Sequence, residues 1–159
     1  MGRVISLDDG LRRRFLATKR GEKVVFTNGI FDLLHRGHLE YLSAAKELGD
    51  VLFVGLNSDA SARRIKGDSR PFVREDDRGY CLASLLFVDY VVLFDADTPL
   101  ELIKALKPDV LVKGGDWKIE EIVGFKEVRS YGGEVLSLPY REGYSTTRLL
   151  EIIAASLTK

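Results

Sequence analysis

The stretch Thr27–Leu42, "TNGIFDLLHRGHLEYL", holds both histidines of the chain, His35 and His38. An apolar, β-rich run over residues 23–28 leads into it, and a segment with helical periodicity over residues 38–49 leads out of it. A strand that passes directly into a helix is the repeating unit of α/β folds. The stretch therefore predicts the first strand–turn–helix unit of such a fold, with two imidazoles at the turn.

The rest of the chain repeats this alternation of short apolar runs and helix-period segments. The runs are almost wholly apolar, which indicates strands buried on both faces. We therefore expect an α/β fold, a Rossmann-like doubly wound parallel sheet of about five strands with helices on both faces. The predicted strands are residues 23–28, 51–57, 90–94, 110–114 and 134–139, and the predicted helices are residues 7–18, 38–49, 74–86, 98–107 and 146–157.

The length of 159 residues suits one domain with one substantial core, and neither a linker nor a repeat interrupts it. We expect a single domain over residues 1–159, with the helix inside residues 1–20 as an N-terminal extension. Ser6, followed by Asp8 and Asp9, favours the start of that helix, because its hydroxyl can cap the first turn and the acidic groups suit the helix dipole.

The charge balance and the single cysteine exclude several classes of protein. With 24 basic and 24 acidic side chains, long-range attraction to nucleic acid or to an anionic membrane is not indicated. Cys81 alone excludes an intramolecular disulfide, and its place in "GYCLASLLF" predicts a buried thiol. The start of the chain lacks the apolar segment of a secretory signal, and no stretch approaches the ~18 apolar residues of a membrane span. The expected compartment is the cytoplasm.

Polar segments follow the predicted strands. In open α/β sheets, ligands bind beyond the carboxyl ends of the strands, at the point where the strand order reverses. A basic segment, "RRIKGDSRPFVREDDR" over residues 63–78, is predicted to be either a mobile flap over this rim or a solvated charged loop. The polar segments at the rim are residues 28–29, 57–59, 94–98, 113–117 and 140–147.

The turn that carries the histidines suits a polyphosphate. The start of the following helix offers unpaired N–H groups and the positive end of the helix dipole. Gly29 lets the backbone approach a ligand closely, and Gly37 leaves room beside the imidazoles. His35 and His38 lie one helical turn apart, so that they can project in the same direction.

Other roles for the two histidines stay open on this evidence. They could form a zinc site with Asp32, cap the helix as structural side chains, or work as general acid and base. An attacking phosphate needs no base, however, since a phosphomonoester with a second pKa near ~6 is mostly dianionic at neutral pH. We therefore favour imidazoles that donate hydrogen bonds to charge developing on a phosphoryl group.

The segment "GIFDLLHRGH", residues 29–38, resembles the signature of the HxGH nucleotidyltransferase superfamily, which joins a nucleoside triphosphate to a phosphate-bearing acceptor and releases pyrophosphate. "EGYSTTRLL", residues 142–150, is similar to the loop and helix start that hold the triphosphate there. The segments "GLNSD", "RRIKG", "FDADTPLELIKALKPDVLVKGGDW" and "GGEVLSLP" resemble one branch, the bacterial D-glycero-β-D-manno-heptose 1-phosphate adenylyltransferases, which make ADP-heptose for lipopolysaccharide cores. The resemblance runs from about Val24 to Ile153.

This resemblance implies three groups of site residues. The backbone at the histidine turn would hold the ATP phosphates, Asp116 the ribose, and Asp32 the turn itself or a bound magnesium. The implied catalytic residues are His35, His38 and Lys66, with Arg63, Arg64 or Arg70 able to share the role of Lys66. The implied nucleotide-binding residues are Gly29, Ile30, Phe31, Gly37, Asp116, Arg141, Gly143, Tyr144, Ser145, Thr146 and Thr147, and the substrate-binding residues are Asp32, Arg64, Lys113 and Trp117.

Simpler readings stand beside these roles. Ser145, Thr146 and Thr147 can merely cap a helix, and the glycines of "KGGD" can merely form a turn. Trp117 can be a packing residue. The cytidylyltransferase branch has an arginine where this chain has Tyr140, which weakens a reading as a cytidine enzyme.

The resemblance also implies partners. They are ATP with Mg²⁺, a sugar 1-phosphate, a second copy of the chain in a homodimer, and a separate heptose kinase upstream. No protein side chain is assigned as a ligand of the Mg²⁺. Two other functions are weighed against this one: a cytidylyltransferase that acts on glycerol 3-phosphate or another small phosphate, and a nucleotide-binding scaffold without activity.

Overall fold

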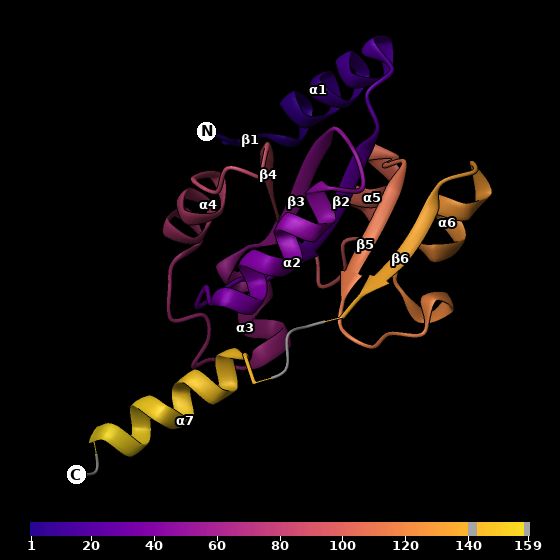
Figure 1. Cartoon of the computed structure of the whole chain (residues 1–159). Coiled ribbons are helices and arrows are strands. Elements are labelled where there is room, and N and C mark those ends of the chain that lie inside the picture. The colour runs from indigo at the N-terminus through magenta and orange to yellow at the C-terminus, as the bar shows by residue number, and fades with distance from the viewer. Residues whose placement is uncertain (140–142, 158–159) are drawn as a thin grey trace.

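The computed structural model describes residues 1–139 and 143–157 and confirms the doubly wound parallel sheet. Six strands lie in the order β1-β4-β3-β2-β5-β6 within the described ranges, and each neighbouring pair is parallel (Figure 1). The strands are β1 (Arg3–Ile5), β2 (Val24–Gly29), β3 (Val51–Asn57), β4 (Tyr90–Phe94), β5 (Val110–Gly114) and β6 (Glu134–Leu138).

Helices cover both faces of this sheet. On one face α2 and α4 pack through residues such as Leu42 and Leu82, and on the other α1, α5 and α6 pack through Ala17, Ile103 and Val128. The helices are α1 (Leu7–Arg20), α2 (Arg36–Lys46), α3 (Asp59–Lys66), α4 (Glu75–Ala83), α5 (Leu100–Leu106), α6 (Phe125–Ser130) and α7 (Thr146–Leu157), with a 3₁₀ turn η1 (Ile119–Glu121). None of them is long and apolar enough to cross a membrane.

The described residues form one strand more than the about five that the sequence predicts, since β1 adds an edge strand beside β4. Three mostly exposed residues are too short a stretch to show a period in the sequence. The predicted loop over residues 63–78 is also too long, because α3 continues to Lys66 and α4 begins at Glu75. Only residues 67–74 connect the two helices.

Two predicted details of the helices are wrong. The prediction that Cys81 is buried fails because only one side of α4, with Gly79 and Leu82 among its residues, packs inward, which leaves the thiol exposed. The predicted helix end at Gly49 fails because α2 ends at Lys46. Gly49 instead permits a close approach to β2, since a Cβ there would lie 2.7 Å from the carbonyl oxygen of Lys23.

The strand order reverses between β2 and β5. From β2 the chain crosses through α2 on one face to β3, and from β5 it crosses through α6 on the opposite face to β6. The two strands pair only at Val25–Phe26 with Val110–Leu111, although they continue to Gly29 and Gly114. Their carboxyl ends therefore border the switch-point crevice where such sheets bind ligands.

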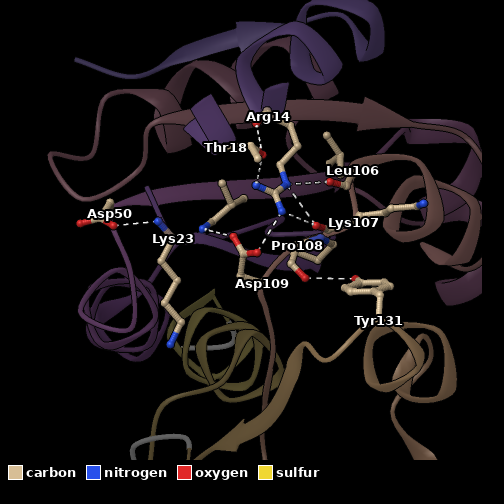
Figure 2. A network of polar contacts seen from close by, with 10 residues as sticks. Arg14, Thr18, Lys23, Asp50, Leu106, Lys107, Pro108, Asp109 and Tyr131 are labelled. Atoms are coloured by element: carbon tan, nitrogen blue, oxygen red, sulfur yellow. Dashed lines mark hydrogen bonds and ion pairs between the residues drawn. The ribbon is translucent and has the colours of Figure 1, made fainter. Parts of the chain in front are cut away.

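Residues 1–20, predicted as an N-terminal extension, supply β1 and α1. The guanidinium of Arg14, on α1, donates to the carbonyl oxygens of Leu106 and Lys107 and, at 2.9 Å, to the carboxylate of Asp109 (Figure 2). The other oxygen of Asp109 accepts from the N–H of Val24 at 2.7 Å. One partly buried ion pair therefore joins α1 to the turn before β5 and to the start of β2.

We predict that Arg14→Met lowers the free energy of unfolding by about 1.5–3 kcal/mol, because several charge-assisted hydrogen bonds are lost at once. Urea unfolding followed by circular dichroism measures it. The matched control is Arg12→Met on the same helix, whose side chain is 80% exposed and pairs with Asp9 only at 3.8 Å; this variant should stay within about 0.5 kcal/mol of the parent chain. Equal effects of the two substitutions would contradict the role given to Arg14.

Candidate active site

The two imidazoles stack on each other at the start of α2. The ring centroids of His35 and His38 lie 3.8 Å apart with an interplanar angle of 22°, and the ring of Phe31 meets His38 edge-on at 5.4 Å. His35 occupies the N-cap position of α2 but its side chain makes no capping hydrogen bond. The alternative of histidines that cap the helix therefore finds no support in the geometry.

Both rings carry a buried nitrogen without a partner. The Nδ1 atoms of His35 and His38 are the buried side-chain polar atoms that lack a hydrogen bond within the described part of the chain. Because an unpaired buried polar group is costly, native structures keep one mainly where a ligand, water or reaction uses it. Each neutral imidazole has one donor and one acceptor nitrogen, so these atoms and the N–H groups at the start of α2 bring several hydrogen-bonding groups to one place.

Both imidazoles are neutral at physiological pH. The pKa of His38 falls from its ordinary value of 6.5 to about 4, chiefly because burial penalises the imidazolium and further because His35 repels it. Burial likewise lowers the pKa of His35. Neutral rings donate N–H hydrogen bonds without repelling each other, and a polyanion would supply the negative charge that favours their protonated forms.

The backbone before the helix is held in an unusual conformation. Phe31 has a φ of 48°, a left-handed value that is rare for residues other than glycine and costs roughly 1–3 kcal/mol. Its ring packs over Gly29, where a Cβ would lie 2.9 Å from Cε2 of Phe31. Gly29 is therefore needed to admit the phenyl ring, in addition to the close ligand approach that the sequence suggests.

Asp32 ties this turn to the segment between α3 and α4. Its carboxylate accepts from Nη1 of Arg70 at 2.7 Å and from the N–H groups of Phe72 and Val73 at 2.8 and 2.9 Å. The side chain is only 6% exposed. Of the two roles that the resemblance implied for Asp32, orientation of the turn is the one that these contacts favour.

A buried arginine completes the connection, although its burial was not predicted from the sequence. Arg78 lies where the predicted basic segment over residues 63–78 overlaps the predicted helix over residues 74–86. Its side chain is fully buried, pairs with Asp59 at 2.7 Å, and donates to the carbonyl oxygens of Val73 and Ile30. It lies four residues before Leu82 on the packed side of α4. That spacing was the signal that could have revealed a buried position.

The basic side chains of α3 take different positions. Arg64 pairs with Asp97 at 2.6 Å and with Asp95 at 3.6 Å, in the segment after β4. Lys66 is exposed at the end of α3 and makes no ion pair with any residue of the described ranges. Of the two, Lys66 is the cation available to a ligand.

The end of β5 is fixed by β6. Gly115, with a φ of 109°, donates its N–H to Leu138 at 2.9 Å and accepts from the hydroxyl of Ser137. The turn leaves Asp116 exposed beside the crevice, and the indole N–H of Trp117 donates to the carbonyl of Gly114 at 3.1 Å. Lys113, the penultimate residue of β5, is partly buried.

The start of α7 approaches the start of α2. A Cβ at Gly37 would lie 3.2 Å from Cβ of Tyr144 and 3.1 Å from the ring of His35, so glycine there admits the loop. Ser145 does cap α7, accepting from the N–H of Arg148 at 3.1 Å, and Thr146 and Thr147 form its first turn. Gly143 precedes them, and Arg141 lies outside the described residues. In Figure 1, α7 extends away from the sheet beyond the ends of β5 and β6.

Residues 1–139 and 143–157 contain no cluster of three or more Asp, Glu, His or Cys side chains that could hold a metal ion. Asp32, three residues before His35, is occupied by Arg70 and two backbone N–H groups. Mg²⁺ commonly keeps several waters and binds through substrate phosphates with few carboxylates. The residues around the histidines therefore fit a Mg²⁺ ion that is coordinated mainly by the phosphates of a bound triphosphate.

Residues 26–152 match the model of the cytidylyltransferase-like family. The chain belongs to this family. The chain is 57% identical over 139 residues to the bifunctional protein HldE of Trichlorobacter lovleyi. This alignment covers 87% of this chain and 28% of that protein. The chain is 54% identical over 140 residues to HldE of Helicobacter pylori, with 88% and 30% covered. The chain therefore spans less than a third of these relatives' length.

Solved structures agree with this membership in a cytidylyltransferase-like family. A lipopolysaccharide core biosynthesis protein from Thermoplasma volcanium is 29% identical, with a TM-score of 0.63 over 79% of this chain and 100% of that chain. The pantoate–β-alanine ligase of Francisella tularensis shares the fold alone, with 16% identity and a TM-score of 0.64 over 89% of this chain and 68% of that one. The nucleotidyltransferase superfamily inferred from the histidine segment is thereby confirmed.

We predict that His38 titrates with a midpoint near pH 4 in the free protein. Between about pH 4 and 6.5, His38 is protonated in the unfolded chain but neutral in the folded protein. The free energy of unfolding is therefore unaffected by this group above pH 6.5 and decreases as the pH falls toward 4. NMR titration of the ring protons measures the midpoint, and the spectrum is simple because the chain has 2 histidines. The His38→Gln variant assigns the signals, and a midpoint near 6.5 would contradict the burial described.

We predict that Asp32→Ala loosens residues 67–74, because Arg70 and two N–H groups lose their acceptor. A loss of about 1.4 kcal/mol raises local opening roughly tenfold, so trypsin should cut after Lys66 or Arg74 at least that much faster. Timed digestion and mass spectrometry measure the rates. Asp68→Ala, an exposed change in the same segment, is the control; equal cleavage of both variants would contradict the role of Asp32.

Proposed function

We propose that the chain is an adenylyltransferase that transfers AMP from ATP to D-glycero-β-D-manno-heptose 1-phosphate and releases pyrophosphate, for lipopolysaccharide core biosynthesis. The observation that carries this proposal is the pair of stacked, neutral imidazoles with unpartnered buried nitrogens beside the switch-point crevice. The identity to HldE and to a lipopolysaccharide core biosynthesis protein supports the choice of acceptor.

The reaction is one displacement at phosphorus. An oxygen of the acceptor phosphate attacks the α-phosphorus of ATP, a new P–O bond forms, and the bond between the α-phosphorus and the bridging oxygen to the β-phosphate breaks. The electron pair leaves with pyrophosphate, and ADP-heptose keeps the α-phosphate. No proton needs to be removed from a dianionic phosphate, so catalysis consists of positioning and electrostatic stabilisation.

His35 and His38 donate hydrogen bonds to oxygens on which negative charge increases in the transition state. Removing one such donor typically lowers the rate ~10²–10³-fold. The N–H groups at the start of α2 bind the phosphates with them, and the side chains that fix Ile30 to Asp32 keep this turn in place before the substrate arrives. Bound Mg²⁺ would neutralise phosphate charge.

Other residues take the roles that the family resemblance implies. Asp116 binds the ribose, Thr146 and Thr147 with the loop before α7 hold the triphosphate, and Lys66 brings positive charge to the α-phosphate from the end of α3. Arg64, paired with Asp97, would have to exchange that partner to reach a substrate.

The proposed pathway context follows from the relatives. HldE is described as bifunctional, and this chain matches under a third of its length. We propose that a heptose kinase activity supplies the phosphorylated acceptor. A reaction that consumes ATP is expected in the cytoplasm, and we retain a homodimer as the proposed assembly.

A pyrophosphate-release assay with a panel of substrates tests this function. We predict turnover that is highest with ATP and D-glycero-β-D-manno-heptose 1-phosphate, and lower with CTP or GTP and with glycerol 3-phosphate. In the same assay His38→Ala should lower kcat by ~10²–10³. Arg12→Met, an exposed change far from the histidines in sequence, should leave kcat unchanged.

Each alternative function has its own outcome in this panel. Turnover of CTP with glycerol 3-phosphate above that of ATP with the heptose phosphate would establish the cytidylyltransferase alternative. Absence of turnover with every pair, together with nucleotide binding, would establish a scaffold. A His38→Ala variant with full activity would remove the imidazoles from the mechanism.

A further inference from the structure

A buried tyrosine of α2 joins the two strands that border the switch point. The phenol hydroxyl of Tyr41 donates to the carbonyl oxygen of Val112, on β5, at 3.2 Å, and it is also hydrogen-bonded to the hydroxyl of Thr27, on β2. Because the phenol carries one hydrogen and a carbonyl oxygen only accepts, the hydroxyl of Thr27 is the donor in the second bond. Two hydrogen bonds in sequence therefore run from β2 through α2 to β5.

These two bonds lie where the pairing of β2 with β5 ends. The last residues that pair are Phe26 and Leu111. The next residues along the two strands are Thr27 and Val112, and the phenol of Tyr41 connects these two in place of continued strand pairing. A side chain from α2 thus bridges the strands at the point from which they run on, unpaired with each other, to their carboxyl ends.

The two hydroxyls lie in an apolar interior. Thr27 is 0% and Tyr41 4% exposed, and Tyr41 packs in the cluster that includes Val25, Leu42 and Val54. A phenylalanine ring would fill the same space without a polar atom that has to be hydrogen-bonded there. The hydrophobic effect is non-directional, whereas a hydrogen bond fixes both a distance and an angle. The hydroxyls therefore hold α2 at a defined distance from the two strands, which apolar packing alone does less sharply.

The same hydroxyl lies between two parts of the candidate active site. Tyr41 follows His38 by three residues, so the two side chains project from the same side of α2 on neighbouring turns. Val112, which accepts from the phenol, precedes Asp116 by four residues along β5 and the turn after it. The phenol of Tyr41 therefore links the helix turn that carries His38 to the strand that leads to Asp116.

We propose that Tyr41 is a positioning residue of the nucleotidyl transfer: its hydroxyl sets the distance between the imidazole of His38 and the ends of β2 and β5. Tyr41 acts through His38 and the two strands and not by contact with a substrate. The inference rests on the proposed function and adds to it a residue of the apolar interior, beneath the crevice.

The Tyr41→Phe variant keeps the ring and removes the hydroxyl. We expect kcat to fall about 10–100-fold with the best substrate pair of the panel, because a displacement of about 1 Å at a catalytic group can cost on the order of 10²-fold in rate. Each KM should change less than about threefold, since the loss falls mainly on the transition state. Steady-state pyrophosphate release, measured well below the Tm of every variant, gives both constants.

Two control variants separate lost position from lost stability. Tyr131→Phe also removes a phenol that donates to a backbone carbonyl, that of Pro108 at 3.0 Å, but before the amino end of β5; it should leave kcat unchanged. Val91→Ala removes two methyl groups from the same apolar cluster at β4, away from the pair of β2 and β5. It should lower Tm and leave kcat unchanged.

A second substitution tests whether the two hydroxyls act as one connection. Thr27→Val keeps nearly the same shape and should lower kcat less than Tyr41→Phe does, because Tyr41 keeps its bond to Val112. The double variant should be no slower than Tyr41→Phe alone, since residues that act through one connection are not additive. Losses that multiply in the double variant would overturn the proposal, as would a kcat of Tyr41→Phe within about twofold of the parent or an equal loss in Tyr131→Phe.

The NMR titration of His38 gives a readout that needs no turnover. Burial lowers the pKa of His38 to about 4, and we expect the midpoint to move toward 6.5 in Tyr41→Phe and to stay in place in Tyr131→Phe. An unmoved midpoint in Tyr41→Phe would contradict the link to His38. Failure of the proposed function has a different signature: the parent chain turns over no substrate pair, while a moved midpoint still shows that the hydroxyl positions the imidazole.

Discussion

The buried guanidinium of Arg78 is the interaction on which the site depends. It joins three segments that are remote in sequence: the turn after β2 through Ile30, the start of α3 through Asp59, and the connection before α4 through Val73. A buried guanidinium is tolerated only when its N–H donors are hydrogen-bonded. Separation of the three segments would leave the Arg78 charge buried without partners, so the segments stay together. The turn between β2 and α2 is thereby held against a rigid support.

This support also holds in place the two neutral imidazoles that we propose as hydrogen-bond donors in catalysis. A left-handed Phe31 and unpartnered Nδ1 atoms are each unfavourable on their own, and the neighbouring packing maintains them. A site prepared in this way does not need to reorganise when charge develops on a phosphoryl group. Under the proposed function, the free energy that stabilises the transition state has been supplied during folding.

The sequence predicted the central sheet well, because strands buried on both faces leave apolar runs, and Val51–Asn57 was predicted without error. It missed β1 and α3, which are too short to show a period. It located the imidazole turn from residue types and spacing. Two contacts could not be foreseen: the buried ion pair between Arg78 and Asp59, and the ion pair between Asp32 and Arg70. A contact between polar side chains that are distant in sequence leaves no local pattern.

The neighbour relation between β2 and β5 bears on how the chain is made. Strands β1 to β4 all lie within the first 94 residues and can pair with each other, but the second edge of β2 stays open until residues 110–114 emerge from the ribosome. An apolar edge strand with unsatisfied peptide groups is a template for pairing with foreign chains. The late arrival of β5 therefore covers this open strand edge of the nascent protein, and in the same step forms the switch-point crevice beside the histidines.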